Sequence, residues 1–106
     1  MAFQPHEHTR TKVLLKNYIN AFNKADMVIF EEIYTVPGRE SKAEIDMISS
    51  KDVVRKIKNH NPKLNILYVQ DNQAVIDQIK SNLKKSDIVI IMGAGTIYNV
   101  IKDIGV

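Results

Sequence analysis

The chain has 106 residues, of which 44% are hydrophobic and 25% are charged, and its formal net charge at pH 7 is +3. This length and composition predict one soluble globular domain with a core of ordinary size. The absence of cysteine excludes disulfides, thiolate metal sites and cysteine-type phosphatase chemistry, and it fits a reducing cytoplasm.

Hydropathy and charge patterns argue against two classes of partner. No apolar run approaches the ~20 residues that a membrane helix needs, and the first residues lack the apolar core of a secretion signal. Lysines are spread along the chain, whereas nucleic-acid binding usually requires a concentrated basic face with aromatic or glycine signatures. We therefore expect neither a membrane nor a nucleic acid as a partner, and we interpret the positive charge as solubility with a mild preference for anions.

The first half of the chain alternates apolar runs with helical periodicity. Ala2–Gln4 has the composition of the tail of a strand, and apolar residues recur at helical spacing from about Thr9 to Asn23. Met27–Ile33 (MVIFEEI) is predicted as a buried strand rich in branched side chains. Tyr34–Ile48 follows as a long connection where about two to six residues would suffice, with a helical turn expected around Lys42–Met47.

The second half repeats this alternation. A capping box at Ser49–Asp52 predicts the start of a helix, and Asn65–Val69 (NILYV) is predicted as the third strand. Asp71 is placed to cap the next helix. Asp87–Met92 (DIVIIM) is predicted as the fourth strand, and Gly93–Thr96 turns into a last helix.

Continuous apolar strands separated by amphipathic helices predict a parallel sheet that is covered on both faces, with right-handed crossovers. The predicted fold is a Rossmann-like, doubly wound α/β domain of about four strands alternating with four helices. Such sheets bind ligands at the carboxyl ends of their strands, where His6–Thr11, Tyr34–Arg39 and Gly93–Thr96 fall. The first strand looks cut short, which suggests that something upstream is missing. Three large side chains are expected in the core: Phe22, Tyr68 and Met92.

The turn after the first strand carries the most chemically active side chains. His6 and His8 have the spacing of a metal chelate, but His60 lies at the far side of the sheet, so we expect no metal site. An anion at the start of the first helix is better motivated, because it would offset the ~0.3–1 kcal/mol by which the helix dipole disfavours each of Arg10 and Lys12. The alternative, in which both cations point into water, fits these residues equally well.

Two further features at strand ends remain open from the residues alone. Gly93–Thr96 could bind a phosphate, but it lacks the third glycine of a dinucleotide fingerprint and the Gly-Lys-Ser/Thr of a nucleotide P-loop. A tight turn that needs small residues explains this segment as well. Glu31 and Glu32 alternate across a strand end, so we expect at least one of them to be solvated.

Several segments resemble, in order, the carboxy-terminal domain of the Mur ligases of peptidoglycan synthesis. FQPHEHTRTKVLL resembles the family's FQPHRYTRT-type segment, and SDIVIIMGAGTIYNV resembles its GDLVLTMGAGDIYKV-type ending. Between them stand ADMVIFEEIY, GRE and SSKDVV in the family's order. The likeness covers nearly the whole chain and is greatest to the branch that adds L-alanine to UDP-N-acetylmuramate.

The resemblance implies that residues 1–106 form most of the third domain of an ATP-dependent ligase, without that domain's first strand and helix. In such a ligase ATP phosphorylates the carboxylate of UDP-N-acetylmuramate, and the amine of L-alanine attacks the acyl phosphate. ATP and Mg²⁺ would be held mainly by the central domain, so this chain alone would be inactive. The other two domains would be its partners, and the Tyr34–Ile48 loop would be mobile without them.

The resemblance also implies roles for individual residues. His6 and Arg10 match the family's histidine and second arginine, so both would contact substrate, and Arg10 would act catalytically on the transferred phosphate. Glu7 and His8 are substrate-binding candidates that depart from the family's arginine and tyrosine, and Arg39 could supply the charge that Glu7 lacks. The alternative is a stand-alone, non-catalytic α/β module that binds an anion or a nucleotide. Such a module would have a complete sheet, whereas a ligase domain would show an uncovered apolar edge.

Overall fold

The computed structural model of the chain describes residues 1–105. Its centre is a four-stranded, all-parallel sheet in the order β3-β2-β1-β4. The strands are β1 (Ala2–Gln4), β2 (Val28–Glu31), β3 (Ile66–Val69) and β4 (Ile91–Gly93). The predicted doubly wound α/β fold is confirmed.

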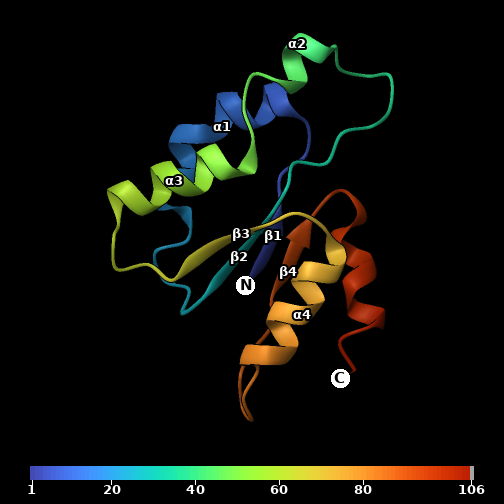
Figure 1. Cartoon of the computed structure of the whole chain (residues 1–106). Coiled ribbons are helices and arrows are strands. Elements are labelled where there is room, and N and C mark those ends of the chain that lie inside the picture. Colours follow the sequence, from blue (N-terminus) through green and yellow to red (C-terminus); the bar gives the residue numbers. More distant parts are fainter. Residues whose placement is uncertain (106) are drawn as a thin grey trace.

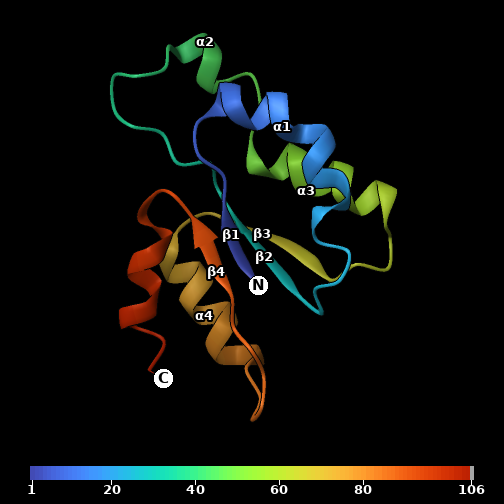
Figure 2. The same cartoon turned by 180° about the vertical axis from the view of Figure 1, so that it is seen from behind.

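Helices cover both faces of this sheet (Figures 1 and 2). On one face, α1 (His8–Ala21) packs beside α3 (Ser50–His60). On the other face, α4 (Asn72–Asn82) packs beside the 3₁₀ helix η1 (Thr96–Lys102). The last helix, predicted only as helical, is thus of the tighter 3₁₀ type.

Each face of the sheet has its own hydrophobic core. Under α1 and α3 the core is aromatic: the Phe3 ring lies 5.4 Å from that of Phe22 and 5.3 Å from that of Phe30, measured between ring centroids. Under α4 and η1 the core is aliphatic. Phe22 is buried and Tyr68 is half-buried, but the prediction that Met92 belongs to the core is wrong, because this side chain is 50% exposed.

The helix starts that were predicted from capping residues are confirmed. Ser49 and Asp52 form the expected capping box at the start of α3. The carboxylate of Asp71 accepts a hydrogen bond of 2.9 Å from the Ala74 amide at the start of α4. In the long connection, the expected helical turn is α2 (Lys42–Ile45).

The first strand has the predicted bounds, and the prediction for the fourth strand needs correction. Pairing at Asp87–Met92 is limited to β4, because within residues 1–105 β4 has one neighbour in the sheet, β1, which is three residues long. β1 looked truncated in the sequence, yet it pairs with both β2 and β4 and forms the centre of the sheet. The outer strand on this side is β4.

Candidate functional site

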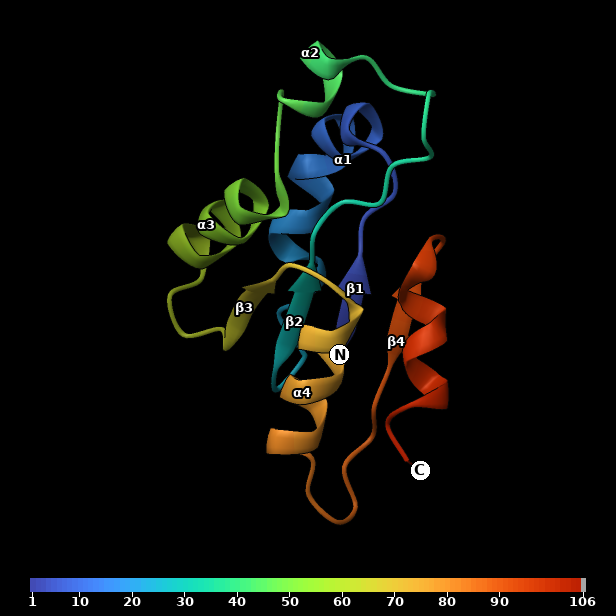
Figure 3. The same ribbon diagram turned by 45° about the vertical axis from the view of Figure 1, so that its right-hand side comes forward.

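The candidate site lies where the sheet reverses its winding. The chain passes from β1 to β2 on one side of β1, whereas β4 lies on the other side, so the switch point falls between the carboxyl ends of β1 and β4. In doubly wound sheets such a switch point opens the crevice in which ligands bind. The segments that follow β1 and β2 leave the sheet at this end and run toward the first turn of α1 (Figure 3).

His6 is held at this end of the sheet by the backbone around it. The Glu7 amide donates to the Tyr34 carbonyl at 2.7 Å, and the Tyr34 amide donates to the Pro5 carbonyl at 2.9 Å. The His6 ring stacks on the Tyr34 ring, with 5.4 Å between the centroids. The side chain of His6 is 18% exposed. His6 is therefore oriented by the fold while part of its ring remains accessible.

The structure brings three of the predicted site residues together. The Glu7 carboxylate lies 3.8 Å from the Arg39 guanidinium and 3.5 Å from Nδ1 of His6. Glu7 has φ 64° and ψ 143°, a backbone conformation that costs a residue with a side chain about 1–3 kcal/mol. Arg39 is 61% exposed. The Arg39 guanidinium therefore lies next to Glu7, at the position where the family has arginine.

Arg10 lies in the first turn of α1 and is exposed, as is Lys12. Within residues 1–105, neither cation forms an ion pair with a carboxylate. Arg10, in the first turn, therefore remains available to an anion that approaches the start of the helix, whereas Lys12 lies in the following turn.

The first amides of α1, by contrast, are already occupied by the protein's own carboxylate. Glu40 accepts hydrogen bonds from the His8 amide at 2.9 Å and from the Thr9 amide at 3.0 Å. Its side chain is only 2% exposed. The hypothesis that a bound phosphate uses these amides is therefore wrong, because Glu40 satisfies them and offsets the helix dipole that Arg10 would otherwise oppose.

The same contacts stabilise Glu40 as an anion. Burial alone would raise the pKa of its carboxyl, but hydrogen bonds from the amide and ring of His8 and from the Thr9 amide outweigh burial. They lower the pKa of Glu40 from 4.5 to about 2.

The His8 side chain is buried and contacts other residues of the domain. Its Nδ1 atom lies 3.0 Å from a Glu40 oxygen and 2.9 Å from the Thr35 hydroxyl, and the residue is 6% exposed. These contacts offer no direct route to a substrate. They fix the connection after β2 at Thr35 and Glu40, so we expect mobility in its exposed residues on either side of Glu40, 37–39 and 41–47.

The Gln4 side chain binds a backbone amide at the start of η1, as the Glu40 side chain does at the start of α1. Its side-chain oxygen accepts a hydrogen bond of 3.0 Å from the Ile97 amide, and its side-chain nitrogen donates to the buried Glu31 carboxylate. Gly95 packs so closely that a Cβ atom there would lie 2.8 Å from this Gln4 oxygen, and it would also collide with the Tyr34 side chain. Close packing therefore accounts for the small residues of this turn.

The expectation that at least one acidic residue at the end of β2 is fully solvated is wrong: Glu31 is buried, and the half-buried Glu32 has its carboxylate hydrogen-bonded to the protein. Glu31 is 3% exposed, and its second carboxylate oxygen has no hydrogen-bond partner within the described part of the chain. Burial, assisted by the negative charge of Asp71, raises the pKa of Glu31 from 4.5 to about 7, against the hydrogen bond from Gln4, which lowers it. Glu32 is half-buried and accepts hydrogen bonds of 2.9 Å from the Ser50 amide and the Tyr68 hydroxyl.

The raised pKa of Glu31 predicts a pH dependence of stability. Because the folded state favours the protonated acid, its contribution is fully present below pH 4.5 and is lost as the pH rises toward 7. The expected loss is on the order of 3 kcal/mol of unfolding free energy. Urea unfolding at pH 5 and pH 8 measures it, and Glu31→Gln is the control that should flatten the difference. An equal pH dependence in both proteins would contradict this assignment.

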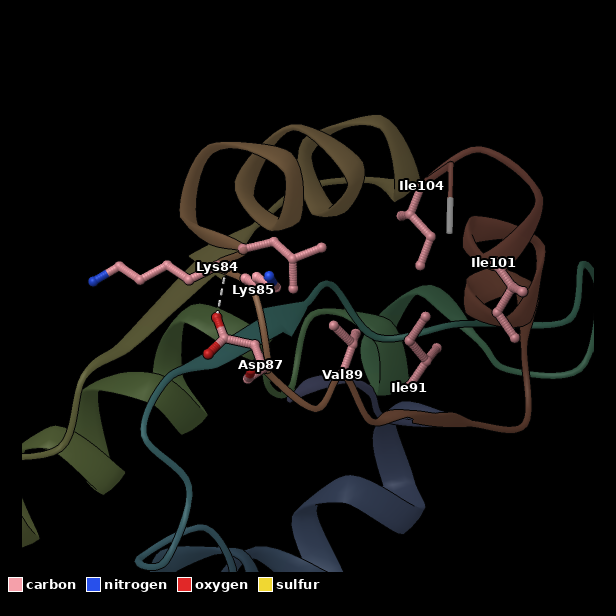
Figure 4. A pocket seen from close by; sticks show the side chains of 9 residues that line it. Lys84, Lys85, Asp87, Val89, Ile91, Ile101 and Ile104 are labelled. Atoms are coloured by element: carbon pink, nitrogen blue, oxygen red, sulfur yellow. Dashed lines mark hydrogen bonds between the residues drawn. The ribbon is translucent and has the colours of Figure 1, made fainter.

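The described residues 1–105 offer no metal centre. No group of three or more His, Cys, Asp or Glu residues within positions 1–105 could hold a metal ion. None of the helices in that range has the length and apolar character to cross a membrane. A cavity of about 690 Å³ opens between α4, β4 and η1, and it is lined by none of the predicted site residues (Figure 4).

Sequence reasoning missed two residues of this region, Glu40 and Gln4. Glu40 belongs to the GRE segment that resembles the family. The resemblance drew attention to this segment, but it did not indicate that Glu40 binds the first amides of α1. Gln4 reaches a residue 93 positions away, and nothing in the local sequence indicates that contact.

Comparisons with known proteins agree on one kind of relative. The chain is 39% identical over 100 residues to a UDP-N-acetylmuramate–L-alanine ligase of Geotalea uraniireducens. It is 35% identical over 98 residues to that of Caldanaerobacter subterraneus and 34% over 98 residues to that of Acetivibrio thermocellus. These matches cover 92–94% of the chain but only 20–21% of each relative.

The chain therefore spans about a fifth of the length of the curated relatives it matches. No family model matches the chain. The resemblance predicted from the sequence is confirmed, and the extent of the match is consistent with a single carboxy-terminal domain.

Proposed function

Because the chain is a domain-sized relative of the UDP-N-acetylmuramate–L-alanine ligases, we propose that it is the carboxy-terminal domain of such a ligase. The full polypeptide would join L-alanine to UDP-N-acetylmuramate in peptidoglycan synthesis, with ATP as the source of energy. Residues 1–106 would close over the amino-acid and terminal-phosphate site, and the UDP-binding and ATP-binding domains would lie elsewhere in the polypeptide. The observation that carries this proposal is the similarity over nearly the whole chain.

The side chains at the carboxyl ends of β1 and β2 and in the first turn of α1 support such a role. Arg10 is exposed and unpaired with any carboxylate within residues 1–105, so its guanidinium is free to meet a phosphoryl group. Charge that develops on the transferred phosphoryl group would be stabilised by a cation at this place. His6, which is stacked on Tyr34, would contact the substrate. Arg39, beside Glu7, adds a second cation at the rim.

The described residues do not fit a complete site for ATP and Mg²⁺. The first amides of α1 are bound by Glu40, and Gln4 binds the Ile97 amide of η1. Neither of these two helix starts can therefore cradle phosphates through these amides. The nucleotide and its metal ion would be held by the other domains, and this domain would contribute side chains only.

The exposed apolar side chains at the edge of the sheet favour a domain of a longer polypeptide over a stand-alone module. A self-sufficient module was expected to have a complete sheet. Instead Ile88, Ile90 and Met92, next to and within the outer strand, are 85%, 45% and 50% exposed. Apolar exposure of this kind marks a surface that is covered in the functional protein.

We expect the purified 106-residue chain to show neither ligase nor ATPase activity, because it lacks the parts that hold ATP and its metal ion. A coupled assay of ADP release, with UDP-N-acetylmuramate and L-alanine present, measures this. The polypeptide encoded by the complete reading frame serves as the positive control. Turnover of ATP above background by the short chain would contradict the proposed division of labour between domains.

A further inference from the structure

The two helices on one face of the sheet concentrate the positive charge of the chain. α1 and α3, which lie side by side (Figures 1 and 2), contain three and four Lys or Arg residues, seven of the fifteen in the chain. Of the twelve acidic residues they contain one, Asp52. α4 and η1, on the opposite face, contain two Lys residues and Asp77. Lysines that are spread along the sequence are thus gathered on one face by the fold.

The charges of this helical layer are accessible and largely unpaired. We define the basic face as the seven exposed cations of the two helices: Arg10, Lys12, Lys16, Lys51, Arg55, Lys56 and Lys58. Within residues 1–105 one of them forms an ion pair, Arg55 with Asp52 at 3.4 Å, and the Arg55 side chain remains 68% exposed. Lys58 donates to the Leu64 carbonyl, which is a neutral partner. The basic face therefore keeps almost all of its positive charge.

Helical spacing directs the cations of α3 away from the sheet. Val53 and Ile57 are fully buried, and Arg55 stands two residues from each of them. At 3.6 residues per turn, this spacing places Arg55 on the side of α3 opposite to the core. Lys51 stands four residues before Arg55 and therefore shares this side of the helix. Both cations thus project outward from the domain.

The outer side of α1 combines cations with one apolar side chain. Val13 stands two residues from the buried Thr11 and two from Leu15, which packs against the core. Val13 accordingly points away from the sheet and is 79% exposed. Arg10 and Lys16 stand three residues before and after it, so one cation lies on each side of Val13 along the helix.

The side chains among these cations favour a lipid surface over a nucleic acid. Proteins that bind single-stranded nucleic acids add exposed aromatic side chains on which the bases stack. Tyr18, the one tyrosine of α1, packs against the core instead, and α3 contains no Phe, Tyr or Trp. The exposed apolar side chain here is aliphatic, Val13, and apolar side chains flanked by Lys and Arg are typical of helices that lie on a membrane surface.

We propose that the basic face binds the surface of an anionic lipid membrane, with its cations on the lipid headgroups and Val13 in shallow contact with the bilayer. A negatively charged lipid surface attracts clustered Lys and Arg side chains within about a Debye length, and each cation adds to the binding. The binding is peripheral, since none of the helices within residues 1–105 has the length and apolar character to cross a membrane. This proposal does not depend on the proposed function.

Vesicle sedimentation with two charge-matched double variants tests the basic face. Lys16→Gln with Arg55→Gln removes two of its cations. The control, Lys80→Gln with Lys102→Gln, removes two exposed cations from α4 and η1 on the opposite face. All four side chains are exposed, so urea unfolding should be nearly unchanged in both variants. The vesicles are pure phosphatidylcholine, or phosphatidylcholine with about one third phosphatidylglycerol, in ~0.1 M salt.

The unchanged 106-residue chain should sediment with the anionic vesicles and not with pure phosphatidylcholine. Salt at about 1 M should release it, because the Debye length then falls to about 3 Å. The double variant of the basic face should bind the anionic vesicles about 30-fold more weakly, as the loss of two cations near a charged surface predicts. The control should stay within about threefold of the unchanged chain, because its two cations lie on the face turned away from the lipid.

Equal weakening by the two double variants would attribute binding to net charge and overturn the proposal, as would equal binding to both kinds of vesicle. Binding to an RNA oligonucleotide without binding to the anionic vesicles would assign the basic face to a nucleic acid and also overturn it. The polypeptide of the complete reading frame is tested in the same way. Absence of vesicle binding there would show that another domain covers the face, which contradicts the proposal whether or not that polypeptide is an active ligase.

Discussion

Arg10→Ala in the ligase polypeptide is expected to lower kcat on the order of 100-fold, by analogy with the removal of a single donor to a developing oxyanion. Glu40 already satisfies the first amides of α1, so charge stabilisation from this end of the domain must come from side chains. Arg10 is the exposed cation of the first turn that also matches the family's arginine. Its planar guanidinium offers a bidentate geometry that lysine does not reproduce, so Arg10→Lys should recover only part of the rate.

Lys12→Ala is the matched control, because Lys12 is a second exposed cation on α1 without a carboxylate partner within residues 1–105. Its kcat should stay near that of the unchanged protein. The Tm of both variants should also be unchanged, since an exposed cation contributes little to stability. Unchanged turnover in Arg10→Ala would remove Arg10 from the site, and a large fall in its Tm would assign it a structural role.

Glu40→Ala is expected to destabilise the isolated domain by about 3 kcal/mol, because hydrogen bonds to a charged group are strong and their loss leaves buried donors unpaired. The donors are the amides of His8 and Thr9 together with the His8 ring, which also holds Thr35. Urea unfolding measures the change. Hydrogen exchange should show the connection after β2 opening in the variant, because Glu40 is its attachment to α1.

Glu44→Ala is the matched control, because Glu44 also caps a helix but lies in the exposed, four-residue α2. Its cost should stay below about 1 kcal/mol. The pKa of Glu40 is lowered to about 2, so its contribution is present above pH 4.5 and is lost as the pH falls toward 2. Equal destabilisation by the two substitutions, or an unchanged acid unfolding profile in Glu40→Ala, would contradict this account.

The helix caps and the order of strands and helices were predicted correctly because they depend on residues that are close together in the chain. The caps at Ser49 and Asp71 are bonds across three residues, and their residue types signal them directly. The apolar runs and helical periodicity likewise specified the doubly wound sheet. The resemblance added His6 and Arg10 as site candidates, which no periodicity could single out.

What the sequence did not predict depends on distant partners. Glu40 binds α1 from 32 positions away, and Gln4 binds η1 from 93 positions away. The run at Ile88–Met92 has the same apolar composition whether its strand is interior or at an edge. Only the arrangement of the sheet shows that it lies at an edge, and this is why Met92 was wrongly expected in the core.

The most direct test of the central claim is a product assay on the polypeptide of the reading frame that contains this chain. The purified protein is given ATP, Mg²⁺, UDP-N-acetylmuramate and L-alanine, and the product is identified by mass while phosphate release is followed. We expect phosphate release that requires L-alanine and is matched in amount by UDP-N-acetylmuramoyl-L-alanine. A folded protein that binds these substrates but forms no such product, or that releases phosphate equally without L-alanine, would contradict the assignment of this chain to the ligase.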